Sequence, residues 1–314
     1  MKYPVWKREL PKFSHKMYNE PLEQLVEFYK EHIRRDVNSG KLLPAGFWEV
    51  ARLFLISAMQ TYAAICILLA DNRPKRLILQ AGILNRSLLE TLGNLMALCQ
   101  APQSRTRILE RELFKNQAVT LQRYRKSFGN EEKWQEFLRV YEQGLEVAAK
   151  DVRISRTYIK NPDRIRDRWP TPGRMIYGDR KRGQPRFLRG TRLAAFREIY
   201  EYHYEGQSEQ AHQRGAALGL ALVVDKPEDQ WNPGHGESNI VSTAILFLTC
   251  ILSELEHKGE YVAHPKLREL WSYLRDIDDE AKDLWRIRYS QLLKASIKRL
   301  KRTAEKRGRL AAGR

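Results

Sequence analysis

Apolar side chains recur at helical spacing along most of the chain. Residues 47–70 and 77–99 are apolar on almost every face, but Arg52 interrupts the first segment and Glu90 the second. Because a charge in mid-bilayer is costly, we expect both segments to be buried helices of a bundle and not membrane spans. Further helices are predicted over residues 21–37, 105–127, 131–150, 191–204, 208–224 and 239–257. No segment alternates with period two for long enough to predict a strand, so the fold class is all-α, a multi-helix bundle.

Two stretches depart from this pattern. Residues 161–190 hold four prolines and four glycines among many arginines, which predicts a long basic loop that orders when a partner binds. Residues 265–284 carry apolar side chains at steps of three and four, and the same predicted helix then turns basic. The chain is therefore expected to comprise an N-terminal arm and helix (1–46), the first half of a helical bundle (47–152), a basic loop insertion (153–190), the second half of the bundle (191–264) and a long amphipathic helix with a basic tail (265–314).

The formal charge of +18 is concentrated in two segments. Residues 153–192 contain thirteen Lys and Arg against three acids, and residues 286–314 contain eleven against one. Each segment thus has a net charge of +10, and the rest of the chain has −2. Clustered positive charge attracts polyanions, whereas dispersed charge mainly maintains solubility. A basic run is nonetheless often only a solvated surface, so this reading stays open beside the binding one.

Aromatic side chains lie among the arginines of the first basic segment, as in many nucleic-acid-binding surfaces. We therefore expect a nucleic-acid partner, RNA in preference to DNA. The residues expected to contact the nucleic acid are lysines and arginines of the two basic segments: Arg164, Arg166, Arg168, Arg174, Arg180, Lys181, Arg182, Arg186, Arg189, Lys298, Arg299, Lys301, Arg302, Lys306 and Arg307.

The three cysteines, Cys66, Cys99 and Cys250, each lie in an apolar run. Three such residues cannot form a disulfide framework or a four-thiolate zinc site, so we expect buried free thiols in a reducing compartment. The first residues of the chain contain no apolar stretch of the secretory type. These observations predict a cytoplasmic protein with no membrane partner.

Two groups of residues could carry chemistry. Arg86 and Glu90 are one helical turn apart in an apolar helix, so they share a face, either as an internal ion pair that fixes packing or as a pair lining a pocket. A second group, Tyr204-x3-Ser208-x3-His212, precedes an apolar run, with Ser208 well placed as a helix N-cap. A histidine on an inner helix face is commonly a hydrogen-bonded core residue, so both readings of His212 remain open.

Together these two motifs resemble those of a family of helical bacterial proteins that is known as a domain of unknown function. The resemblance covers residues 50–225 without the basic loop, and that family also looks related to HEPN-like helical domains. Such domains often act as metal-independent ribonucleases of defence or toxin systems, assembled across a homodimer. The resemblance therefore implies catalysis without a cofactor, and a homodimer or a subunit of a larger complex.

The HEPN-like pattern is an arginine followed after four to six residues by a histidine. Arg197 and His203 have this spacing, whereas His212 has no arginine at that distance. In such a site the histidine would move the proton of a ribose 2′-hydroxyl, and Arg197 or Arg86 would stabilise the phosphate. Because the two resemblances select different histidines, His203 and His212, whether the protein is an enzyme stays open.

Two other hypotheses come from different classes. The first is a non-catalytic helical scaffold that docks onto nucleic acid or an acidic partner through its basic tail. The second is a di-iron carboxylate bundle, suggested by Glu209-x2-His212 and Glu254-x2-His257 on separate predicted helices. Such a site also needs carboxylates from two further helices, and the acids between the two pairs fall in or beside a predicted loop.

Overall fold

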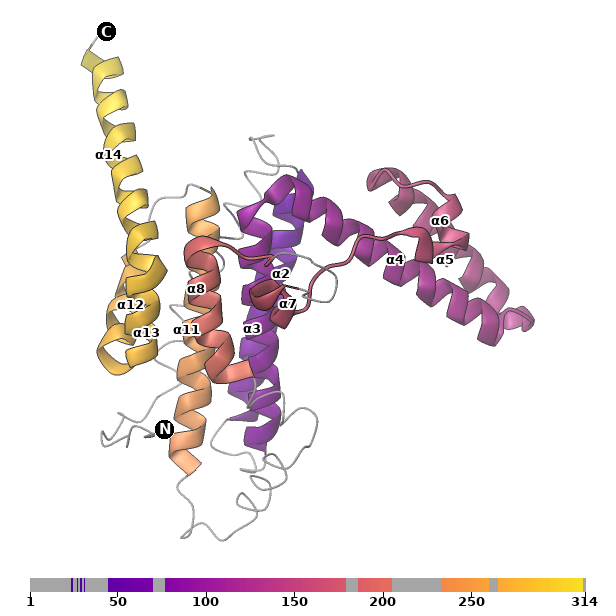
Figure 1. Cartoon of the computed structure of the whole chain (residues 1–314), viewed down its shortest axis with the longest axis horizontal. Coiled ribbons are helices and arrows are strands. Elements are labelled where there is room, and N and C mark those ends of the chain that lie inside the picture. Colours follow the sequence, from indigo (N-terminus) through magenta and orange to yellow (C-terminus); the bar gives the residue numbers. More distant parts are fainter. Residues whose placement is uncertain are drawn as a thin grey trace. The chain divides into compact units, whose positions relative to one another are not determined.

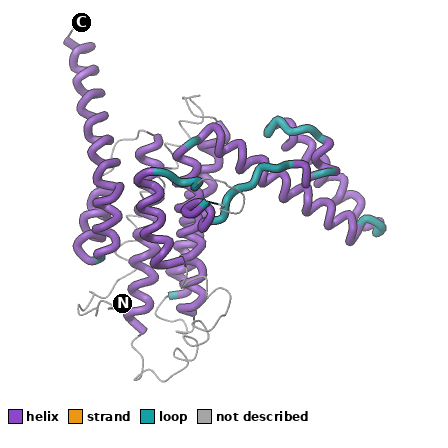
Figure 2. The backbone as a smooth tube through the Cα atoms, in the orientation of Figure 1, coloured by secondary structure: helices purple, strands orange, loops and turns teal. Residues whose placement is uncertain are grey.

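The computed structural model describes residues 45–69, 77–178, 186–204, 233–259 and 265–312, and also Gln24, Glu27, Tyr29 and Glu31, which are helical. The regular elements in these ranges are all helices (Figures 1 and 2), which confirms the predicted all-α class. The chain divides into two compact units. Unit 1 comprises Met1–Gln100 and Pro172–Arg314, and unit 2 comprises Ala101–Thr171.

The helices of unit 1 are grouped around α11. They are α2 (Ala45–Leu68), α3 (Ile78–Gln100), α7 (Pro172–Tyr177), α8 (Gly190–Ile199), the π-helical turn η4 (Tyr200–Tyr204), α11 (Pro233–Gly259), α12 (Pro265–Ile277), α13 (Asp279–Leu284), the π-helical turn η6 (Trp285–Tyr289) and α14 (Ser290–Ala312). Residues 241–256 of α11 are buried without interruption, and α11 and α2 both pack on α3. A helix that is apolar on all sides has to be enclosed in this way by its neighbours.

Polar groups inside α11 are satisfied locally or by a neighbouring helix. Thr249 Oγ1 donates to the Ile245 carbonyl at 2.7 Å, and Ser253 Oγ donates to the Thr249 carbonyl at 2.7 Å. Trp271 Nε1 of α12 donates in turn to Ser253 Oγ at 2.9 Å. The hydroxyl groups of Thr249 and Ser253 are thus accommodated in the core because each has a hydrogen-bond partner.

Helices α3 and α8 approach closely at Gly93. A Cβ atom built on Gly93 would lie only 2.3 Å from Cζ of Phe196, which is fully buried on α8. The absence of a side chain at this position therefore allows the Phe196 ring to lie directly against the backbone of α3.

Among the residues that the structure describes, two helices are long and apolar enough to cross a membrane, by length and composition alone. In α11 the window Ile240–Gly259 is 89% buried, and in α2 the window Gly46–Leu68 is 28% buried, with Leu53 and Ile67 exposed. Such helices are weak evidence for a membrane, because the core helix of a soluble bundle meets the same criteria. The expectation that residues 47–70 form a buried helix holds for one face of α2 only, and the exclusion of a membrane partner stays a prediction.

Unit 2 is a helical hairpin followed by a basic segment, residues 153–171, which packs on the hairpin and is called the strap below. Helices α4 (Pro102–Phe128) and α5 (Glu132–Asp151) pack on each other, and α6 (Thr157–Lys160) and the 3₁₀ turn η2 (Pro162–Arg164) follow. The shared core consists of Phe114, Ala118, Leu121, Leu138, Leu145, Ala149, Ile159 and Ile165. Lys115 Nζ donates to the Ile165 carbonyl at 3.0 Å, and Arg111 pairs with Asp167 at 3.1 Å, so polar contacts also hold the strap on α4.

These contacts correct two expectations. The expected boundary between residues 152 and 153 is replaced by boundaries after Gln100 and before Pro172, because α4 and α5 build a core with residues 157–165 of their own unit. Residues 153–178 were expected to be loop, yet they include three short helices, α6, η2 and α7. Residues 179–185 of the expected basic loop lie outside the described residues, as do the predicted helix 208–224 and most of the predicted helix 21–37.

Helix α5 ends in a Schellman motif. Arg153 has a φ of 55°, its N–H donates to the Lys150 carbonyl at 3.1 Å, and the Ile154 N–H donates to the Ala149 carbonyl at 2.8 Å. This left-handed position usually holds glycine. The turn sends the chain back over α4 and places Ile159 in the core.

The C-terminal segment also differs from the expectation of one long helix. Asp278 interrupts it: its carboxylate accepts hydrogen bonds from the N–H groups of Glu280 at 2.8 Å and Ala281 at 3.2 Å and so starts α13.

Helix α11 begins at Pro233, six residues earlier than predicted, in a stretch that was expected to be loop. Proline fits the first turn of a helix, where its missing N–H has no intrahelical partner.

Candidate functional site

The predicted Arg86–Glu90 pair is present on α3 and is only half-buried. Arg86 Nε lies 3.1 Å from Glu90 Oε1, with the two side chains 18% and 38% exposed. Tyr204 of η4 completes the group: Arg86 Nη2 donates to the Tyr204 hydroxyl at 2.7 Å, and this hydroxyl donates to Glu90 Oε1 at 3.3 Å. The Arg86 guanidinium also lies over the Tyr204 ring, 4.5 Å from its centroid. The structure therefore unites two residues of the first predicted motif with one of the second.

A row of tyrosines continues from this group. The rings of Tyr200 and Tyr204 stack with centroids 4.4 Å apart, because the π-helical turn places both on one side. Tyr177 of α7 meets Tyr200 edge-on at 6.4 Å, and its hydroxyl donates to Glu201 at 2.9 Å. Single π-helical turns are often found at functional sites. The row of tyrosines and the Arg86 group therefore form the candidate site of the region that resembles the family of unknown function.

The hydroxyls of Tyr177 and Tyr204 stay protonated at neutral pH. Burial and then the carboxylate of Glu90 raise the pKa of Tyr204, and Arg86 opposes both effects. Burial and the hydrogen bond to Glu201 raise the pKa of Tyr177. Both phenols are therefore hydrogen-bond donors and not bases at pH 7. The group offers one guanidinium whose charge Glu90 already balances, an arrangement that holds η4 against α3.

The predicted pair Arg197 and His203 is directed to different partners. Arg197 lies 3.0 Å from Glu201 and over the ring of Tyr177, at 5.7 Å from its centroid. His203 is buried, with Nε2 2.7 Å from Glu280 of α13 and its ring edge-on to Phe247. The structure does not bring these two side chains together, and His203 fits the alternative of a hydrogen-bonded core histidine. Ser208 and His212 lie outside the described residues.

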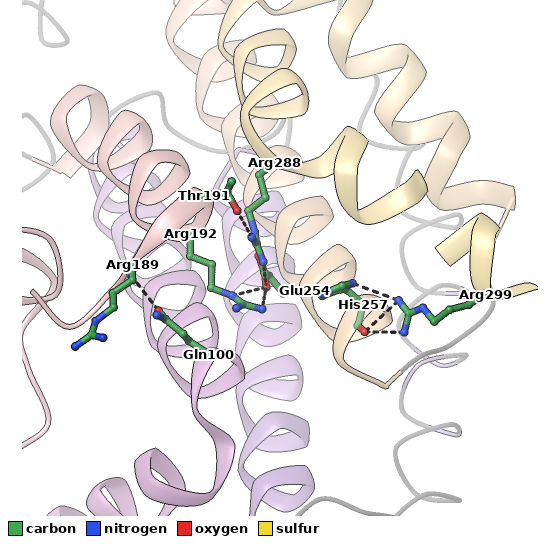
Figure 3. Close-up of polar contacts among 8 residues, drawn as sticks. All are labelled: Gln100, Arg189, Thr191, Arg192, Glu254, His257, Arg288 and Arg299. Atoms are coloured by element: carbon green, nitrogen blue, oxygen red, sulfur yellow. Dashed lines mark hydrogen bonds and ion pairs between the residues drawn. The ribbon is translucent and has the colours of Figure 1, made fainter. Parts of the chain in front are cut away.

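Most of the described basic residues of the predicted interface are exposed. In unit 2 these are Arg164, Arg166 and Arg168; in unit 1 they are Arg174, Arg186, Arg189, Lys298, Lys301 and Arg302. The remaining predicted cations Arg180, Lys181 and Arg182 lie outside the described residues, as do the side chains of Lys306 and Arg307 on α14. Arg189 is held by its backbone, whose N–H donates to Gln100 Oε1 at 3.2 Å, so its guanidinium extends away from Gln100 (Figure 3).

Arg299 departs from the predicted role. It is half-buried, and its guanidinium donates to the carbonyl of His257, with Nη1 at 3.4 Å and Nη2 at 3.5 Å (Figure 3). Nη2 also lies 3.3 Å from His257 Nδ1. Burial, and then the neighbouring Arg299, lower the pKa of His257 to about 4, whereas Glu254 acts in the opposite direction. Arg299 therefore anchors α14 to the end of α11.

The ion pairs of Glu254 were not predicted from the sequence, and Glu254 is the most buried charged side chain in the described part of the chain. Glu254 of α11 is fully buried and accepts hydrogen bonds from Arg288 and Arg192 (Figure 3). Arg288 Nη2 lies 2.8 Å from Glu254 Oε2, Arg192 Nε lies 3.1 Å from the same oxygen, and Arg288 Nη1 donates to Thr191 at 2.7 Å. Burial alone would raise the pKa of Glu254, but the two arginines outweigh it and lower this pKa.

This group changes two sequence-based interpretations. Arg192 and Arg288 were counted in the basic segments, yet both charges serve the core. Glu254 and His257 were the second half of the predicted di-iron motif, yet both oxygens of Glu254 accept from arginines. Within the described part of the chain, no three His, Cys, Asp or Glu side chains form a group that could hold a metal ion. Arg192 and Arg288 are far apart in the sequence, and only their approach to Glu254 in the folded chain reveals the role of this carboxylate in the core.

The cysteines are free thiols, as predicted. Cys99 and Cys250 are buried, and Cys66 is half-buried. Burial, and secondarily the charge of Glu254, raise the pKa of Cys99 to about 12. A thiol with such a pKa is inert as a nucleophile at neutral pH.

Part of the chain is similar to a known protein family. Neither the curated proteins nor the solved structures contain a match to this chain. A family model matches residues 49–230, which is more than half of the chain and includes Arg86, Glu90 and Tyr204 but ends before α11 and α14. The predicted resemblance to a family of unknown function is thereby confirmed, whereas the relation to HEPN-like domains has no support from these comparisons. The chain belongs to the family of unknown function DUF5677.

Proposed function

We propose that the protein binds nucleic acid, RNA in preference to DNA, through the basic face of α14. The observation that carries the proposal is the row of exposed cations Lys294, Lys298, Lys301 and Arg302 on this helix. Lys294, Lys298 and Lys301 follow one another at steps of four and three residues, about 6 and 4.5 Å apart along the helix axis, so they lie on one side of the helix. Arg302 directly follows Lys301 and widens this face. Such a row matches the repeated charges of a phosphate backbone.

The way α14 is attached supports this role. Its first half packs on η6 and α11, and Arg299 fixes it to His257 at the end of α11. Lys301 and Arg302 follow this anchor, and Figure 1 shows α14 continuing as a helix past the end of α11. A helix that is anchored at one end holds its charged side chains in a defined arrangement before the ligand binds, so less conformational entropy is lost on binding.

The proposal does not extend to cleavage. His203 is engaged with Glu280 and the ring of Phe247, and Arg197 is directed to Glu201.

Unit 2 contributes the exposed cations Arg164, Arg166 and Arg168, which form a second basic surface on that unit.

Fluorescence anisotropy with labelled single strands of RNA and DNA of one sequence tests the proposal. The variant Lys298→Ala/Lys301→Ala/Arg302→Ala should weaken RNA binding by at least tenfold at low salt, because three phosphate contacts are lost. The matched control, Arg107→Ala/Arg123→Ala/Lys126→Ala, removes three exposed charges from α4 and should change the affinity much less. Equal losses in the two variants would show that only net charge matters and would contradict a binding face on α14.

A further inference from the structure

Helix α5 carries a row of exposed apolar side chains beside its packed face. Phe137 is 43% exposed, Val140 54% and Val147 58%. Gly144 lies in the same row, and a Cβ atom added there would meet nothing within 4 Å. The steps of three, four and three residues are those of a helix–helix seam. Single exposed apolar residues are ordinary, but an ordered row marks an interaction surface.

Charges of opposite sign continue the row at its two ends. Lys133 lies four residues before Phe137, and Asp151 lies four residues after Val147, both exposed. Lys133 is 3.0 Å from Glu131, but these side chains are 74% and 46% exposed, so that pair is weak. Eighteen residues of α-helix are about 27 Å long, so Lys133 and Asp151 cannot meet within one helix.

We propose that α5 packs antiparallel on α5 of a second copy of this chain, about a two-fold axis at position 142. In this register Lys133 faces Asp151 of the second copy, and Phe137 faces its Val147. Val140 then lies over Gly144 of the second copy, where the missing side chain leaves room for it.

The flanking charges fit the same register. Glu136 and Lys150 are exposed on one side of the row, and antiparallel packing places each beside the other residue of the second copy. Glu136 already pairs with Arg139 at 2.6 Å, and both are more than half exposed, so it can accept a second cation. A two-fold interface has to be self-complementary, and the order of charges along α5 is.

Parallel packing fits less well, because it would place Lys133 opposite a second Lys133 and leave Gly144 facing Gly144 across a gap. A partner of another kind has no reason to match a pattern that is complementary to itself. A single helix pair buries less than a standard interface of about 1,600 Å², so we expect a dimer that dissociates in the micromolar range.

Sedimentation velocity of the full chain over a range of concentrations tests the proposal. Wild type should pass from monomer to dimer. Lys133→Asp and Asp151→Lys should each raise the dissociation constant roughly tenfold, because each places like charges opposite each other twice per dimer. The double variant Lys133→Asp/Asp151→Lys should restore wild-type association. Both replacements also suit the helix macrodipole, with an acid in the first turn and a base in the last, so α5 should remain folded.

Two controls separate this interface from general charge effects. Lys126→Asp makes the same charge change on α4 and should leave association unchanged. Val147→Glu should abolish the dimer while circular dichroism shows unchanged helix content. A wild-type chain that remains monomeric would overturn the proposal, and so would a double variant as weak as either single one. RNA binding through α14 is measured separately, so failure of either proposal is recognised independently.

Discussion

Replacing Glu254 by leucine should destabilise unit 1 more than any substitution of an exposed charge. Glu254 is fully buried and Arg288 is 3% exposed, so Glu254→Leu leaves at least one guanidinium buried without its counter-ion. Removing one partner of a buried ion pair costs about 3–5 kcal/mol of unfolding free energy. Arg192 keeps 15% of its side chain exposed and can turn to water, so most of the cost is attributed to Arg288.

Restoring charge balance should recover much of this loss. In Glu254→Leu/Arg288→Met both ends of the ion pair become apolar, a replacement that is often nearly neutral for stability. We therefore expect the double variant to be more stable than Glu254→Leu by about 2–4 kcal/mol. Glu254→Gln, which keeps the shape and removes only the charge, should lie between the wild type and Glu254→Leu.

The same group should give a defined dependence on pH. The arginines lower the pKa of Glu254 in the folded chain, so its contribution is fully present above the unfolded-state pKa of about 4.3 and is lost as pH falls through the lower folded pKa. The difference in unfolding free energy between wild type and Glu254→Gln should therefore shrink below about pH 4.

Urea unfolding followed by circular dichroism measures the unfolding free energy of each variant. If unit 2 unfolds in a separate transition, the shift in the urea midpoint of the unit 1 transition is compared between the variants. If Glu254→Leu lost less than about 1 kcal/mol, or if the double variant were no more stable than the single one, the buried ion pair would not have the role described here.

Three further substitutions probe particular contacts, each by thermal or urea unfolding. Gly93→Ala places a methyl group into the Phe196 ring and should destabilise unit 1 by about 1–3 kcal/mol; an unchanged midpoint would mean that α3 and α8 are less closely packed. Arg153→Gly relieves a left-handed position and should stabilise unit 2 by about 0.5–1 kcal/mol, whereas a loss would contradict the Schellman geometry. Asp278→Ala removes the cap of α13 and should cost about 1 kcal/mol, and Asp278→Asn, which keeps an acceptor, should cost less.

Local patterns along the sequence were sufficient for most helices and for one part of the candidate site. The helical apolar spacing predicted α3, α4, α5 and α8, and the one-turn separation of Arg86 and Glu90 predicted their ion pair. Tyr204 lies 118 positions from Arg86 and 114 from Glu90 in the sequence, and no local pattern predicts contacts over such separations. The π-helical turn that aligns Tyr200 with Tyr204 likewise has no sequence signature.

Other differences have local signals that were present but outweighed. Asp278 stands before Asp279 and Glu280, a typical helix start, yet the leucine spacing on both sides predicted one continuous helix. The arginines of residues 153–171 obscured Ile159 and Ile165, the two apolar residues that fix this strap on α4. Net charge, finally, does not distinguish Arg288, which neutralises Glu254 in the core, from Lys301, which is exposed.

The salt dependence of RNA binding tests the proposed function most directly. For a single strand, the slope of log K against log salt is about −0.7 per phosphate contact. If α14 is the binding face, Lys298→Ala/Lys301→Ala/Arg302→Ala should reduce the steepness of this slope by about 2 relative to the wild type, and the control in α4 should leave it unchanged. A slope that is the same in the wild type and in the α14 variant would contradict nucleic-acid binding through this helix.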